Sequence, residues 1–350
     1  MFKNFWYALD FSANVSTQPR RVTALMEEFV LYRVPSSQQA IVLSDLCVHR
    51  GGALSDGWMK DDCIVCPYHG WQYTADGVCV KIPANLPGVP IPKKARVDCY
   101  PTREQHGFVW AFLGDIPEAE RPPLPSLNEL PNAQVTRGEF KWNAPYTRVI
   151  EHLMNIAHAP FLYGSLPSEP MVEGFATQTT AWGASVNATV RGEVKKGWFG
   201  KQMVNAPARL SLHAPHITQH ELTLPQGAFN LICAHSPVNA RATITKWIAA
   251  RSFAQADSFT SLMVEKIFKA AQHAIALGAE ALSNELVTTF RRLNEEALQR
   301  GWAIDAHLIE SEYSRMQAVV IPSPARKEVA DLAWAWVMKE MPVRKVNSEQ

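Results

Sequence analysis

The sequence predicts an α+β chain in which an all-β N-terminal domain precedes a mixed domain of strands and helices. Three observations predict this order. Short apolar, β-rich runs separated by glycine turns fill residues 1–115. A proline-rich stretch follows them. The rest of the chain alternates between strand-like runs and segments rich in Ala, Leu, Glu and Lys at helical spacing.

The N-terminal domain is predicted to span residues 1–115 and to form a small β-sandwich or barrel. Its strands are expected at residues 22–25, 29–34, 40–46 and 108–113, where β-branched and aromatic residues gather. Glycine-containing turns such as Gly51-Gly52 and Asp76-Gly77 separate these runs.

A linker is predicted at residues 116–135, because prolines crowd this stretch and each removes a backbone donor. The second domain is predicted to span 136–342, with a polar tail at 343–350. Within it we expect strands that include 184–194 and 242–248, and helices at 149–161, 261–298 and 325–339.

Composition excludes several classes of protein. The 350 residues carry a formal net charge of +1, which gives no support for a nucleic-acid partner. No apolar run approaches the ~20 residues that a membrane-spanning helix needs. The N-terminus lacks the pattern of a signal peptide, so a cytoplasmic protein is expected, and its six cysteines are expected to be reduced.

Two short motifs each pair a cysteine with a histidine. Cys47 and His49 form a C-x-H motif, and Cys66 and His69 form a C-x-x-H motif. In a Rieske-type [2Fe–2S] cluster, two histidines replace two of the cysteines on one iron, so this ligand set fits that cluster. A zinc site with two Cys and two His is the alternative, although zinc fingers usually place their histidines three to five residues apart.

The stretch DLCVHRGGALSDGWMKDDCIVCPYHGWQY closely resembles the Rieske domain of Rieske non-haem iron ring-hydroxylating and demethylating oxygenases. The segments NFWYALDF and GVCVKIPAN resemble the same family. One departure is Val48, where the family commonly has proline. Cytochrome bc-type Rieske proteins fit less well, because the extra pair of cysteines that they typically carry is missing here.

The resemblance implies that the second domain has a helix-grip (START-like) fold and binds one mononuclear Fe(II) through two histidines and a carboxylate. Residues 151–163, EHLMNIAHAPFLY, match the family's iron-binding helix with three changes. His152 replaces an Asn, Asn155 replaces an Asp, and Tyr163 replaces the second His ligand. His158 is retained as a ligand.

The third ligand is expected to be Asp305, because Ile304–Ser311 fits the family's carboxylate segment. Glu295-Glu296 is a rival that fits this segment less well, and an ordinary solvated helix acid is the alternative for Asp305.

Three interpretations of the altered helix stay open. His152 could bind the iron, although six residues of regular helix separate it from His158 by about 9 Å of rise. Tyr163 could bind iron as a phenolate, which would favour Fe(III). The site could also be weak or empty, with His152 simply hydrogen-bonded on a helix face. Asn155 replaces the family's Asp that links a cluster histidine to an iron histidine of the next subunit, and an amide cannot supply that negative charge.

The resemblance implies the oxygenase α subunit of such a system. Electrons would come from a flavin-dependent reductase, directly or through a ferredoxin, for O2-dependent hydroxylation or demethylation of a small, mostly apolar substrate. A homotrimer is implied, with no nucleic acid or membrane as partner. The alternative is a non-catalytic or retuned relative with an impaired iron site, acting as an electron carrier, sensor or partner subunit.

Overall fold

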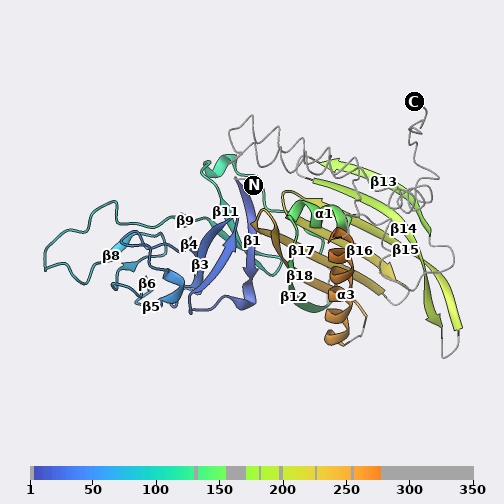
Figure 1. Cartoon of the computed structure of the whole chain (residues 1–350), viewed down its shortest axis with the longest axis horizontal. Helices are drawn as coiled ribbons and strands as arrows, with labels where there is room; N and C mark the ends of the chain where they lie inside the picture. Colours follow the sequence, from blue (N-terminus) through green and yellow to red (C-terminus); the bar gives the residue numbers. More distant parts are fainter. Residues whose placement is uncertain are drawn as a thin grey trace. The chain divides into compact units, whose positions relative to one another are not determined.

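The computed structural model describes residues 4–129, 133–154, 171–180, 183–196, 200–224, 227–253 and 256–276 (Figure 1). These residues divide into two compact units. One unit takes the described residues up to 127 together with 236–246, and the other takes the rest. The domain boundaries expected from the sequence stay predictions.

The N-terminal unit is built from small antiparallel sheets. A three-stranded sheet has the order β1-β11-β10, with β1 (Phe5–Phe11), β11 (Phe108–Leu113) and β10 (Thr102–Gln105). A four-stranded sheet has the order β2-β3-β4-β9, with β2 (Arg20–Ala24), β3 (Glu27–Arg33), β4 (Ala40–Ser44) and β9 (Cys99–Tyr100). A second four-stranded sheet has the order β5-β6-β7-β8, with β5 (Trp58–Lys60), β6 (Cys63–Val65), β7 (Gln72–Tyr73) and β8 (Cys79–Lys81). Short 3₁₀ helices lie at Ser12–Asn14, Leu54–Asp56 and Glu118–Glu120.

The two four-stranded sheets of this unit share one buried cluster. Val30 and Leu43 enter it from β3 and β4, and Ile64 enters it from β6. Cys47 and Cys66 belong to the same cluster. Burial of these apolar side chains therefore fixes the positions from which both cysteine-bearing loops start.

The second unit contains a seven-stranded antiparallel sheet (Figure 1). Its order is β12-β18-β17-β16-β15-β14-β13, so the chain runs as a meander from β13 to β18, which then pairs with β12. The strands are β12 (Gln134–Trp142), β13 (Met171–Thr180), β14 (Gly183–Lys196), β15 (Gly200–His213), β16 (Ile217–Leu224), β17 (Gly227–Asn239) and β18 (Ala242–Arg251).

Helices α1 (Tyr146–Met154) and α3 (Asp257–Ala276) pack on one face of this sheet. In α3, Val264 and Phe268 recur at helical spacing and enter the core. Asp257 lies in its first turn, where a negative charge is favourable, and its carboxylate accepts a hydrogen bond of 2.6 Å from Arg251. The sheet and the two helices thus form one layered core.

The predicted fold class is confirmed, with an all-β N-terminal unit followed by a mixed unit. The helix predicted at 149–161 begins earlier, at Tyr146, directly after Pro145, a residue that suits the first turn of a helix. The helix predicted at 261–298 also begins earlier, at Asp257. Its end and the helix predicted at 325–339 lie outside the described residues. Among the described helices, none is long and apolar enough to cross a membrane.

Candidate functional site

Two loops of the N-terminal unit bring the four predicted cluster ligands together. Cys47 lies in the loop after β4, and Cys66 lies in the loop between β6 and β7. The rings of His49 and His69 follow on these loops with their centroids 4.5 Å apart. Both cysteines are buried and both histidines are exposed, so the sulfurs face the core while the imidazoles face outward.

The two loops repeat one backbone pattern. The amide of Cys47 donates to the carbonyl of Gly52, and the amide of Gly51 donates back to Cys47. In the second loop the amide of Cys66 donates to Trp71, and that of Gly70 donates to Cys66. Gly51 and Gly70 have φ of 67° and 71°, a conformation that glycine adopts without strain. Each ligand pair is therefore held in a tight turn of its own.

The residues present fit a Rieske-type [2Fe–2S] cluster. One iron of such a cluster takes two thiolates and the other takes two imidazoles, which matches the inner cysteines and the outer histidines. A Cβ at Gly52 would meet the Cys66 sulfur at 3.1 Å, so glycine lets the two loops approach. Among the described residues, no three or more Cys, His, Asp or Glu side chains lie close enough together to hold a single metal ion. A cluster that takes two protein ligands on each iron does not require such a convergence.

Neighbouring groups change the pKa values of the predicted ligands. Burial raises the pKa of the Cys66 thiol, and Cys47 beside it raises this pKa further. Desolvation lowers the pKa of His49, and the adjacent His69 adds to that effect, which favours the neutral imidazole that binds metals. The Tyr73 hydroxyl lies 3.0 Å from the Cys47 sulfur. Tyr73 was not a site prediction, and the only signal for it is its place at the end of the CPYHGWQY motif.

A buried carboxylate supports the first loop. Asp45 is fully buried and accepts hydrogen bonds from the Arg21 side chain at 2.9 Å and from the Ser55 hydroxyl at 2.7 Å. It also accepts one from the Ser55 amide at 2.6 Å, while its own carbonyl accepts one from Leu54. Because these bonds join both ends of the loop that carries Cys47, Asp45 positions that loop.

Of the residues predicted for the mononuclear iron site, the structure describes His152. It lies in the last turn of α1 and is buried. Burial lowers its pKa to about 4, and the charge of Arg148 contributes. Asn155, His158, Tyr163 and Asp305 lie outside the described residues. The predicted iron ligand set therefore stays a prediction.

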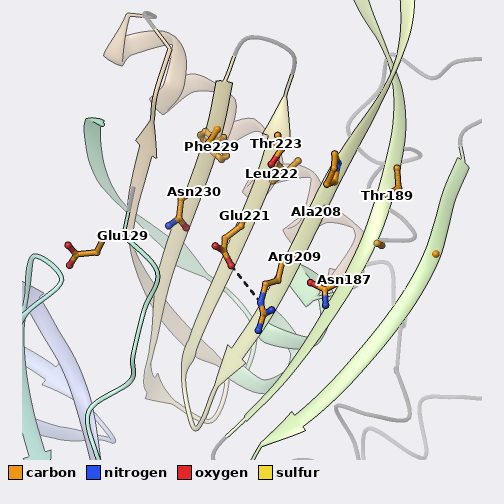
Figure 2. Close-up of a pocket in the computed structure, with 14 residues that line it drawn as sticks. Glu129, Asn187, Thr189, Ala208, Arg209, Glu221, Leu222, Thr223, Phe229 and Asn230 are labelled. Atoms are coloured by element: carbon orange, nitrogen blue, oxygen red, sulfur yellow. Dashed lines mark ion pairs between the residues drawn. The ribbon is translucent and has the colours of Figure 1, made fainter. Parts of the chain in front are cut away.

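A cavity of about 430 Å³ lies on the face of the sheet that points away from α1 (Figure 2). Arg209 and Glu221 line it from neighbouring strands, and their charged groups lie 3.8 Å apart. Glu221 pairs with Asn230, whereas the next residue of β17, Leu231, packs in the core with α1. Side chains alternate along a strand, so this cavity and the helix lie on opposite faces of the sheet.

Two family models match the chain. One, described as Rieske [2Fe-2S] domain, matches residues 5–101. The other, described as Vanillate O-demethylase oxygenase C-terminal domain, matches residues 142–277. The two matches follow one another in the order that the sequence predicted.

Curated relatives match about half of this chain. Aminopyrrolnitrin oxygenase PrnD of Pseudomonas fluorescens is 30% identical over 211 residues, which cover 53% of this chain and 56% of that protein. A chlorophyllide a oxygenase of Chlamydomonas reinhardtii is 34% identical over 166 residues, covering 47% of this chain and 25% of that protein. The matched part of the chain thus spans between a quarter and somewhat more than half of these relatives.

Solved structures match the chain over most of its length. A dicamba monooxygenase structure has a TM-score of 0.65 at 18% identity, covering 91% of this chain and 98% of that one. The NdmA QL mutant of Pseudomonas putida CBB5 has a TM-score of 0.64 at 20% identity, covering 88% and 94%. At these identities the likeness concerns the fold.

Proposed function

Because the chain belongs to the Rieske non-haem iron oxygenases, we propose that it is the oxygenase component of a system that hydroxylates or demethylates a small, mostly apolar substrate with O2. The family implies a [2Fe–2S] cluster and a mononuclear iron. When bound, these groups supply electron transfer and oxygen activation. The proposal rests on one observation. Two loops with the same backbone hydrogen-bond pattern bring Cys47 and His49 close to Cys66 and His69.

In this proposal the chain's own residues present the cluster to a partner. The exposed His49 and His69 are flanked by Leu46, Val48 and Tyr68, whose side chains are 57%, 48% and 63% exposed. Apolar side chains around a polar centre favour a contact that excludes water. We assign this rim to the protein that exchanges electrons with the cluster.

Partners and assembly are part of the same proposal. A flavin-dependent reductase would supply electrons, directly or through a ferredoxin. A homotrimer would bring the cluster of one subunit to the iron site of the next, with Asn155 between them. The exposed apolar rim is consistent with such a contact between two copies.

A second candidate function is that of a retuned or non-catalytic relative. The specific observation is the altered sequence motif at residues 151–163, in which Tyr163 stands at the second histidine position and Asn155 at the aspartate position. Such a protein would keep the cluster and the fold and would act as an electron carrier, sensor or partner subunit.

Iron content separates the two candidates. We expect the purified protein to contain about three irons per protomer if both sites are filled, and about two if only the cluster is present. Asp305→Ala should remove about one iron and leave the visible spectrum of the cluster intact. Glu295→Ala is the matched control and should leave the iron count unchanged.

Oxygen consumption completes the test. With NADH, a flavin reductase and a ferredoxin, the three-iron protein should consume O2 when an O-methyl or N-methyl aromatic compound is added. Three irons with no consumption across a panel of such compounds would contradict the oxygenase function.

A further inference from the structure

A long loop, residues 82–98, joins β8 to β9 in the N-terminal unit and extends beyond its sheet (Figure 1). The start of this β8–β9 loop lies against the second ligand loop, because a Cβ at Gly70 would meet Cγ of Pro83 at 3.1 Å. Gly70 directly follows the predicted ligand His69. The β8–β9 loop therefore borders the predicted cluster site.

Both ends of the β8–β9 loop are anchored in the core. Ile82 and Ile91 pack against the same buried apolar cluster as the two predicted cysteine ligands. The amide of Cys79 donates to the carbonyl of Ala95 at 2.9 Å. Four of the ten residues from 83 to 92 are prolines, and each fixes its backbone φ angle. A loop held in this way presents its side chains to a partner at a small cost in conformational entropy.

The charges around the predicted ligands have one sign. Residues 46–55, 64–75 and 77–97 carry the ligands and the β8–β9 loop, and they contain five basic residues and no acidic one. The whole chain, in contrast, has a formal net charge of only +1. The five basic residues are all exposed and are Arg50, Lys81, Lys93, Lys94 and Arg96.

Most of this positive charge has no acidic partner in the described part of the chain. Arg96 is partly offset, because its side chain donates to the carbonyl of Asp76 at 3.5 Å. Lys81, Lys93 and Lys94 form no ion pair with another described residue. Their ammonium groups are therefore available to a negatively charged surface.

Apolar side chains are exposed on the same loop. Leu86 is 75% exposed and Val89 is 50% exposed. The amide of Val89 donates to the carbonyl of Leu86, and Gly88 between them has φ of 82°, so a tight turn holds both side chains at the surface. With Val48 and Tyr68 beside the ligands, they form an apolar surface edged by positive charge. This composition suits contact with a protein of opposite charge.

We propose that the β8–β9 loop docks an acidic protein that supplies electrons to the cluster. The inference rests on the proposed function and names the chemistry of the partner, which carries negative charge around its own redox group. Opposite charges steer such a partner towards the ligands, so docking is strongest at low ionic strength. In each encounter one electron leaves the partner, which is oxidised, and enters the [2Fe–2S] cluster, which is reduced, and no bond forms or breaks.

Binding of an acidic electron carrier tests this assignment. An oxidised, fluorescently labelled plant-type [2Fe–2S] ferredoxin is titrated with the full-length protein carrying its cluster, and anisotropy gives the dissociation constant. We expect binding to be at least about tenfold tighter in about 50 mM salt than in about 500 mM salt, because salt screens exposed charges. Cytochrome c, a basic electron carrier, should bind at least about tenfold more weakly than the ferredoxin in the lower salt.

Charge variants identify the surface responsible. Lys93→Glu combined with Lys94→Glu should weaken ferredoxin binding at least about tenfold in the lower salt, and less than about threefold in the higher salt. The same variant should bind cytochrome c more tightly than the wild-type protein. Lys266→Glu combined with Lys269→Glu makes the same change of charge at exposed positions of α3. This matched control should alter ferredoxin binding less than about twofold.

Two further measurements complete the test. Leu86→Ser should weaken ferredoxin binding about threefold in both salt concentrations, because salt does not screen an apolar contact. With reduced ferredoxin, stopped-flow absorbance should show the cluster of the Lys93, Lys94 variant reduced at least about tenfold more slowly in the lower salt.

Four results would overturn the assignment. They are equal weakening by the loop and α3 variants, equal affinity for ferredoxin and cytochrome c, no detectable ferredoxin binding, and loop variants that change only vesicle binding or self-association. In the last case, phosphatidylglycerol vesicles or sedimentation would identify a membrane or a second copy of the chain as the occupant.

Ferredoxin binding requires neither O2 nor the mononuclear iron, so its failure is distinct from failure of the proposed function. A protein that shows the expected binding but consumes no O2 with iron loaded contradicts the oxygenase function alone. A protein that consumes O2 but binds ferredoxin equally well in every variant contradicts the docking assignment alone.

Discussion

The cluster loops and the sheet covered by α1 place their polar side chains in opposite environments. The loops place two imidazoles at the surface, above buried sulfurs and the buried Asp45. The sheet keeps His235 and Thr218 inside its core, where their side chains are hydrogen-bonded. The first arrangement leaves two imidazoles accessible to a partner, whereas the second keeps its polar groups within the core.

The difference also concerns how each region is stabilised. Each cluster loop closes on itself through short-range backbone bonds, such as that from Gly70 to Cys66. The polar side chains on the sheet instead depend on the pairing of β16 with β17 and on burial by the helices. Substitutions in the loops should therefore act on the cluster directly, and substitutions on the sheet should act through the packing of β16 and β17 against the helices.

The largest expected effect is the loss of the cluster. Cys66→Ser should abolish the visible absorbance of the oxidised [2Fe–2S] centre, because an alkoxide or alcohol replaces a thiolate ligand poorly. Absorption spectra and iron analysis measure this. Cys99→Ser removes an exposed thiol of the same unit and should leave the spectrum unchanged. Colour and iron at the wild-type level in Cys66→Ser would refute the ligand assignment.

The next effect concerns the mononuclear site. If that site is an impaired triad, Tyr163→His restores two histidines and one carboxylate, a set that suits Fe(II), and iron affinity should rise. Adding Asn155→Asp should speed electron transfer from the cluster, measured by stopped-flow absorbance under reductant.

The same variant tests the competing interpretation. If His152 already binds the iron, Tyr163→His should change little, and His152→Asn in the native background should release iron. We favour the impaired site, because a regular helix would separate His152 from His158 by about 9 Å of rise. An experimental structure with His152 Nε2 or Nδ1 within about 2.0–2.3 Å of a metal would contradict this preference.

A smaller effect is expected where Asp45 supports the first loop. Asp45→Asn should lower the free energy of unfolding by about 2–3 kcal/mol, because it weakens charge-assisted hydrogen bonds of a fully buried group. Urea unfolding followed by the cluster absorbance measures this. Asp56→Asn removes a carboxylate that lies 3.7 Å from the same Arg21 but is 72% exposed, and it should cost less than about 0.5 kcal/mol. Equal costs for the two variants would show that Asp45 does not support the loop.

The four predicted cluster ligands could be grouped from the sequence for a physical reason. Its ligands are separated by few residues within each loop, so spacing alone reports which side chains meet, and the structure places His49 beside His69. Asp45 was not predicted, because its partner Arg21 comes from β2 and its partner Ser55 lies ten residues further along the same loop. A lone Asp two residues before a ligand carries no signal of its own.

The second unit was harder to interpret from the sequence. His216, Thr218 and His220 alternate with other residues, a period that places them on one face of a strand. The sequence shows that period, but it does not show that His235 lies opposite, because the pairing of β16 with β17 depends on the fold. The iron ligands have the same difficulty, since His158 and Asp305 are distant in the chain.

The smallest expected effect is a pH dependence at Glu104, on β10 of the N-terminal unit. Glu104 accepts hydrogen bonds of 2.6 and 3.0 Å from Arg33, and these bonds lower its pKa. A carboxyl whose pKa is lower in the folded state stabilises the fold above its unfolded pKa of about 4.3, and this contribution is lost as the pH falls through the folded pKa. Glu104→Gln should therefore reduce the loss of stability between about pH 5 and pH 3, by less than about 1 kcal/mol because the pair is partly exposed. Urea midpoints measured from pH 3 to pH 7 give the dependence of stability on pH.

The control is Glu118→Gln, whose partner Arg103 is mostly exposed, and this variant should keep the wild-type pH dependence. An identical pH dependence for all three proteins would exclude Glu104 as a source of acid sensitivity.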